Sequence, residues 1–115
     1  MPNECSNYIT ITTTAETAEA DIQSILQEIQ SKSRRLVIIT QRNKAGLRCK
    51  YITDWEPNFE FIETLLERYP LIWIKNEWIS EDGTAGIFVG EINNIQSLCW
   101  QDLSLEAEDF FFSSR

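Results

Sequence analysis

The length, charge and histidine content of this chain limit what it can be. It has 115 residues, a formal net charge of −8 and 43% hydrophobic residues, which is typical of one folded domain spanning residues 1–115. A chain of this length buries roughly two-thirds of its unfolded surface, so we expect folding without a disulfide or a metal. Histidine is absent, which removes the most common general base and the usual ligand of catalytic zinc. We therefore expect a protein that is not an enzyme and that needs no cofactor or metal.

The cysteines and the apolar segments indicate where the protein works. Cys5, Cys49 and Cys99 lack the spacing of a metal site or a disulfide framework, and an isolated cysteine is commonly a small core residue. The first residues lack the basic and apolar regions of a signal peptide, and no apolar run is long enough to cross a membrane. We expect reduced thiols, no membrane partner and a cytoplasmic protein, located in the host cell if its origin is viral.

The first part of the chain predicts a strand followed by a helix. Residues 6–14 are rich in β-branched side chains that alternate, with Ile9 and Ile11 on one face and Tyr8 on the other. Residues 15–32 repeat apolar side chains at helical spacing, with polar side chains on the other faces. We expect both elements to turn their apolar side toward one core.

A β-hairpin is predicted next, with strands at residues 35–41 and 47–53 and a turn at residues 42–46. Its second strand separates into two faces. One face carries Leu47, Cys49, Tyr51 and Thr53, and the other carries Arg48, Lys50 and Ile52. The first set predicts the core side, and the second predicts the side turned away from it.

The following residues predict a second amphipathic helix and two more strands. The helix begins near Pro57, which suits a first helical turn, and it ends before Pro70, which cannot continue a helix. Residues 71–79 and 85–92 predict strands joined by a turn that contains an Asp-Gly pair.

The carboxyl-terminal part gives weaker patterns. Residues 95–100 predict either a strand or a packed loop, and residues 104–111 predict a short closing helix. The order of elements, β-α-β-β-α-β and then an added strand, predicts an α+β fold of the ferredoxin-like split β-α-β sandwich type. It would have an added carboxyl-terminal β-hairpin strand and a short tail helix. Two helices would then cover one face of an antiparallel sheet and leave the other face open.

Three segments carry a family resemblance. The opening Met-Pro-Asn-Glu-Cys-Ser-Asn resembles that of a phage- and plasmid-encoded family of ferredoxin-like proteins of unknown activity, whose members typically begin Met-Pro-Asn-Trp-Cys-Ser-Asn. Thr53-Asp54-Trp55-Glu56-Pro57 and Gly83-Thr84-Ala85-Gly86 are similar to later segments of that family. The chain departs from the family at Glu4 and lacks its Trp-Gly-Thr-Lys-Trp stretch. The resemblance implies the fold and a phage, viral or plasmid origin, without implying a mechanism.

Charge is strongly segregated along the chain. Seven basic residues and no acidic residue lie between Lys32 and Lys50, whereas eight acidic residues and only one basic residue lie from Glu77 to the end. One interpretation is a docking surface for phosphate or an acidic protein. The other is that the basic hairpin pairs with the acidic tail, within the fold or across a homodimer.

The leading hypothesis is a small non-enzymatic protein-interaction module of phage, viral or plasmid origin that acts on host or defence proteins. Its partner would be another protein or a second copy of the chain. The predicted partner-binding residues are Arg42, Lys44, Arg48, Lys50 and Tyr8.

Two alternatives involve nucleic acid. The basic hairpin Lys32–Lys50 could form a nucleic-acid-binding surface, but RNA-binding domains of this strand order stack bases on several aromatic side chains, and the predicted central strands offer only Tyr8 on that face. The acidic tail could instead mimic nucleic acid.

Overall fold

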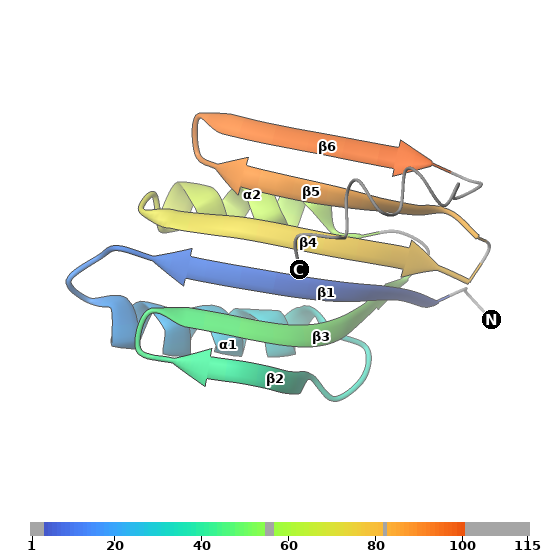
Figure 1. Cartoon of the computed structure of the whole chain (residues 1–115). Coiled ribbons are helices and arrows are strands. Elements are labelled where there is room, and N and C mark those ends of the chain that lie inside the picture. The colour runs from blue at the N-terminus through green and yellow to red at the C-terminus, as the bar shows by residue number, and fades with distance from the viewer. Residues whose placement is uncertain (1–3, 55–56, 82, 101–115) are drawn as a thin grey trace.

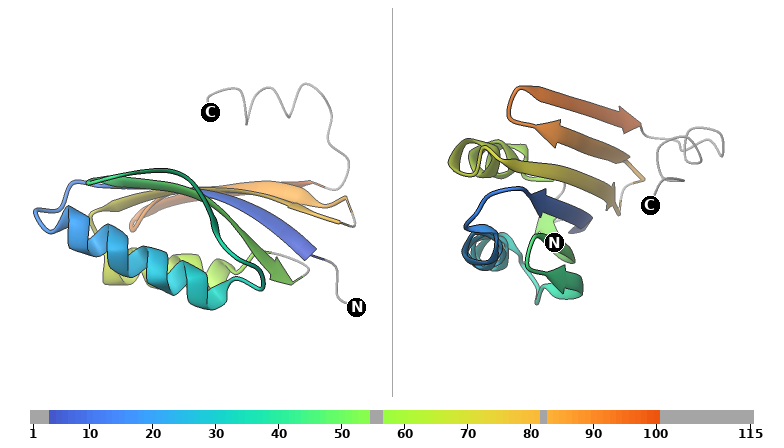
Figure 2. Two further views of the ribbon diagram at one scale, coloured as in Figure 1. Left: turned by 90° about the horizontal axis from the view of Figure 1, so that it is seen from below. Right: turned by 60° about the vertical axis from the view of Figure 1, so that its left-hand side comes forward.

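The structure is a computed structural model that describes residues 4–54, 57–81 and 83–100, with the backbone alone for 98–100. These residues form one antiparallel sheet, in the strand order β2-β3-β1-β4-β5-β6, and two helices. Both helices lie on the same face of the sheet (Figures 1 and 2). The elements are β1 (Glu4–Thr13), α1 (Ala18–Lys32), β2 (Ile38–Asn43), β3 (Gly46–Asp54), α2 (Phe59–Arg68), β4 (Ile72–Ser80), β5 (Ala85–Glu91) and β6 (Asn94–Trp100).

The predicted ferredoxin-like split β-α-β sandwich is wrong as a description of this chain, although the coarser α+β class holds. The sheet has six strands, because β5 and β6 continue it as full ladders rather than as an appended hairpin strand. Residues 95–100, predicted as a strand or a packed loop, lie in the edge strand β6. Alternation in a sequence identifies strands but does not show how many of them join one sheet. The predicted tail helix at residues 104–111 lies outside the described residues.

Local hydrogen bonds explain two of the element boundaries. β2 begins at Ile38 rather than at residue 35, because two hydrogen bonds fix the preceding residues in a loop against β3. The Arg34 N–H donates to the Ile52 carbonyl at 2.9 Å, and the Ile52 N–H donates to the Ser33 hydroxyl at 3.1 Å. α2 begins after Asn58, whose side chain accepts a hydrogen bond from the Phe61 N–H at 3.0 Å.

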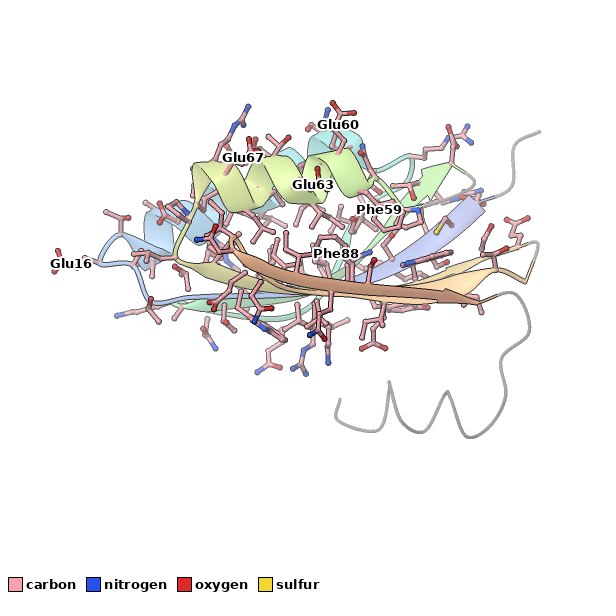
Figure 3. The ribbon with its side chains drawn as sticks, turned by 90° about the horizontal axis from the view of Figure 1, so that it is seen from above. Glu16, Phe59, Glu60, Glu63, Glu67 and Phe88 are labelled. Carbon is pink, nitrogen blue, oxygen red and sulfur yellow. The ribbon has the colours of Figure 1, made fainter. Side chains whose placement is uncertain are left out.

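The core lies between the sheet and the two helices. The apolar stripe of each helix is buried against the inward-facing side chains of β1, β3 and β4, and each such side chain stabilises the fold by roughly 1.5–3 kcal/mol. Phe59 of α2 contacts Phe88 of β5, with ring centroids 6.0 Å apart, and Figure 3 shows both between helix and sheet. The buried stripes are Ile22, Ile25, Leu26 and Ile29 in α1 and Phe61, Ile62, Leu65 and Leu66 in α2.

Two asparagines form a hydrogen-bonded pair inside this core. Asn7 of β1 and Asn76 of β4 are both fully buried, and the Asn76 amide nitrogen donates to the Asn7 side-chain oxygen at 3.1 Å. The Asn7 amide nitrogen donates in turn to the Thr53 hydroxyl at 2.9 Å and to the Cys5 carbonyl at 3.1 Å. Since buried amides are costly without partners, this network ties β1 to both of its neighbours.

Replacing Asn7 with alanine is expected to lower the free energy of unfolding by about 2–3 kcal/mol, because the Asn76 amide nitrogen then loses its acceptor inside the core. Urea unfolding measures this loss, and Gln30→Ala on the exposed side of α1 is the control. The double variant Asn7→Ala/Asn76→Ala should cost less than the sum of the two single variants. Strictly additive losses would show that the two amides do not interact.

Gly90 is required where β5 turns toward β6. Its φ angle is +149°, and a Cβ atom there would lie 2.1 Å from the Asn94 carbonyl oxygen and 2.8 Å from the Ile95 Cα. Both obstacles are backbone atoms of the paired strand, so they cannot rotate away as a side chain would. Only glycine therefore lets this end of β5 approach β6.

The variant Gly90→Ala is expected to lose about 1–3 kcal/mol of unfolding free energy through strain at this position. The matched control is Gly46→Ala, because a Cβ at Gly46 would be no closer than 3.4 Å to any neighbour. Thermal melts followed by circular dichroism compare the two variants. Equal melting temperatures would contradict the strain at Gly90.

Candidate functional site

The side of the sheet opposite the helices carries polar and charged side chains on β3, β1 and β4, bordered by apolar side chains on β5. Strand register places these side chains in two cross-strand rows, one through Tyr8 and one through Thr10. In such rows the side chains of adjacent strands lie within contact distance. We call these residues the open face: Lys50, Tyr8, Glu77 and Ile87 in one row, and Arg48, Thr10, Lys75 and Val89 in the other.

Tyr8 and Lys50 form a pair at the centre of the open face. The Lys50 ammonium lies 5.7 Å from the centroid of the Tyr8 ring, a cation–π contact that contributes roughly 0.5–1 kcal/mol at an exposed position. Tyr8 is nevertheless 47% exposed. The ring and the charge are thus available together to a partner.

Lys75 and Glu77 form an ion pair on the same strand. The Lys75 Nζ lies 3.4 Å from the Glu77 carboxylate, and the two side chains are only 12% and 6% exposed. This pair leaves two cations, Arg48 and Lys50, without an ion-pair partner among the described residues. The open face is therefore positively charged, although the whole chain is acidic.

A small hollow lies within the open face. Its volume is ≈ 150 Å³, below the roughly 300–1,000 Å³ of typical small-molecule sites. Its walls offer hydroxyl groups beside two cations and one carboxylate, a lining that suits one acidic or polar side chain of a partner. The lining residues are Tyr8, Thr10, Thr40, Arg48, Cys49, Lys75 and Glu77.

A larger hollow of ≈ 470 Å³ lies where α2 begins, beside the end of α1. Lys32 and Arg34 contribute positive charge there, but Asp54 and Glu60 line the same space. The Arg34 guanidinium already pairs with Asp54 at 2.7 Å. This mixture of charges gives the larger hollow no preference for an anion.

The five residues predicted to bind a partner are not all together. Tyr8, Arg48 and Lys50 share the open face, and Lys44 lies in the tight turn between β2 and β3. Arg42 lies toward the helices, where its guanidinium donates to the Gln23 side chain of α1. A register shift between Ile39 and Gln41 accounts for this, because it pairs Arg42 with the inward-facing Leu47.

Sequence reasoning missed Lys75 and Glu77 as members of the site. They lie far along the chain from the basic hairpin, and the pairing of β1 with β4 brings them beside Tyr8 and Thr10. The available signal was the alternation in residues 71–79, which puts both on one face.

Part of the basic segment is neutralised within the fold. Arg34 pairs with Asp54, and Arg35 makes two hydrogen bonds to the Glu4 carboxylate. The hydrogen bond and the charge of Arg35 hold the pKa of Glu4 below its usual value. The predicted pairing with the acidic tail concerns residues 101–115, which lie outside the described residues.

In the part of the chain that the structure describes, chemically reactive groups are buried or solvated rather than gathered into a site. Burial raises the pKa of Cys49 to about 12 and also raises the pKa of Tyr51, so neither ionises near neutral pH. The carboxylates of Glu60, Glu63 and Glu67 are exposed on α2, and Figure 3 shows Glu60 and Glu67 turned away from the sheet. The described ranges contain no cluster of potential metal ligands.

Cys49 is expected to react with iodoacetamide at least about tenfold more slowly in the folded protein than in urea, because a buried thiol with a raised pKa holds almost no thiolate at pH 8. Peptide mapping by mass spectrometry follows the labelling of this one residue. Equal rates in the two states would show that the thiol is accessible in the fold.

No protein-family model, curated protein or solved structure matches this chain. The resemblance of its opening to a phage- and plasmid-encoded family stays a prediction. Neither of the two described helices is long and apolar enough to cross a membrane.

Proposed function

We propose that this protein is a small non-enzymatic protein-interaction module that binds an acidic protein surface through its open face. The observation that carries the proposal is the position of Arg48 and Lys50, which lie on the face opposite α1 and α2 and have no ion-pair partner among the described residues. Complementary charge steers association and fixes the register of the two surfaces. The half-exposed ring of Tyr8 adds apolar contact area at the centre.

The contacts of Tyr8 favour a protein partner over RNA. RNA-binding sheets stack two or three bases on exposed aromatic faces. Here the Lys50 ammonium lies over the ring of Tyr8, and the Glu77 carboxylate occupies the next position in the same row. The net charge of −8 also repels a polyanion at long range. The alternative of an acidic nucleic-acid mimic depends on the tail, outside the described residues.

The origin and location of the protein belong to the same proposal. The resemblance of the opening residues supports a phage, viral or plasmid origin, with a partner among host or defence proteins. The free thiol of Cys49 fits a reducing cytoplasm.

Reversing charge on the open face should weaken the association with the partner. Arg48→Glu and Lys50→Glu are each expected to reduce partner recovery roughly tenfold, because each replaces an attraction with a repulsion. Lys32→Glu at the end of α1 makes the same charge change on the helix side and should leave recovery unchanged. Affinity capture from a host lysate, quantified by mass spectrometry with and without nuclease, measures all three variants.

Two outcomes would contradict the proposed function. Loss of the captured material after nuclease treatment would identify nucleic acid as the ligand. Equal recovery by Arg48→Glu, Lys50→Glu and the unmodified chain would show that the open face does not bind the partner. Circular dichroism of each variant confirms that the fold is retained.

A further inference from the structure

The outer edge of β2 is open and apolar at its centre. β2 lies at the end of the strand order and pairs with β3 alone, and all six of its residues are exposed. Leu36 just before the strand is 91% exposed, and Ile38 and Ile39 are 56% and 43% exposed. An edge of this kind can accept another strand through its main-chain N–H and C=O groups.

Basic side chains stand at both ends of this apolar edge. Arg34 and Arg35 precede it, and Arg42 and Lys44 follow it. Arg34 and Arg35 are paired within the fold, whereas Arg42 makes a hydrogen bond to a neutral amide. The exposed edge thus presents an apolar centre followed by two cations, Arg42 and Lys44, that make no ion pair among the described residues, whereas Arg34 and Arg35 at its other end are neutralised by Asp54 and Glu4.

The net charge of the chain disfavours a second copy as the occupant of this edge. Each copy carries a formal net charge of −8, so two copies repel each other. The register shift at Thr40 further interrupts a regular ladder in both copies.

We propose that the outer edge of β2 binds an extended acidic segment of the partner as an additional antiparallel or parallel strand. This inference rests on the proposed function and names the element of the partner that is recognised. Main-chain hydrogen bonds to β2 supply affinity, and alternate side chains of the segment contact Ile38 on the open-face side and Ile39 on the helix side. Acidic residues of the segment meet Arg42 and Lys44 at the end of the edge where neither cation has an ion-pair partner among the described residues.

The added strand would also enlarge the open face. Ile38 pairs with Lys50, which pairs with Tyr8, so side chains of the added strand continue this row outward. One partner can therefore contact the edge of β2 and the open face together, and its surface would be acidic at both places.

The probe for this inference is a fluorescent synthetic peptide, Asp-Glu-Val-Thr-Val-Thr-Val-Glu-Asp, titrated with the full chain and followed by anisotropy. We expect saturable binding that weakens at least about tenfold when the Val and Thr amides are N-methylated, since this removes main-chain donors but keeps charge and side chains. A peptide with Lys and Arg in place of the acids should not bind.

Two edge variants localise the binding. Ile39→Lys on β2 is expected to weaken peptide binding about tenfold, because it puts a long charged side chain on the apolar centre. Ile95→Lys on β6 is the matched control, since Ile95 is 40% exposed on the opposite edge of the sheet. It should leave the affinity unchanged.

Each contrary result overturns the inference in a recognisable way. Equal binding of the N-methylated peptide would show that surface charge, rather than main-chain hydrogen bonding, accounts for the interaction. Equal weakening by Ile95→Lys and Ile39→Lys would show that the peptide does not bind specifically at β2. A chain that sediments as a dimer and becomes a monomer with Ile39→Lys would show that a second copy occupies the edge. Absence of peptide binding, with lysate capture still sensitive to Arg48→Glu, would end this inference and leave the proposed function standing.

Discussion

The register of β1 between β3 and β4 is the constraint on which both sides of this protein depend. It places Ile9, Ile11 and the buried Asn7 against the helices, and it places Tyr8 on the opposite side, between Lys50 and Glu77. A shift of one residue would exchange the two sets, since strand side chains alternate strictly. The hydrogen bonds from Asn7 to Thr53 and from Asn76 to Asn7 oppose such a shift from both neighbouring strands. The core and the open face are thus specified by the same pairing.

The two sides of the sheet carry different kinds of side chain. The helix side holds the apolar stripes and the aromatic contacts of Phe59, and its ionisable Cys49 is kept protonated by burial. The side opposite α1 and α2 holds Arg48 and Lys50, which make no ion pair among the described residues and therefore add no ion-pair energy to the fold. Charge on that side can therefore serve association with little effect on the fold.

The alternation of apolar residues and their helical spacing predicted most strands and helices, because both patterns arise when one face of an element is buried in the core. They separated Cys49 and Tyr51 from Arg48 and Lys50 correctly. The six-stranded sheet was not predictable in this way, because pairing of β5 and β6 with the rest depends on distant contacts. The face on which Arg42 lies could not be predicted for a different reason. The register shift at Thr40 reverses the alternation of side chains within β2, and no sequence pattern indicates that shift. The Asn7–Asn76 pair was hidden too, since polar residues in a strand usually indicate solvent.

The irregularity in β2 has an evolutionary consequence. This strand is exposed along its whole length, so gaining or losing one codon within it disturbs few buried contacts. Such a change would nevertheless move every later side chain of β2 to the opposite face of the sheet. It would therefore carry the Arg42 guanidinium from one surface of the protein to the other. The same event in β1 would invert the core. This lineage can therefore redistribute cationic groups between surfaces through indels at its periphery, while its centre tolerates none.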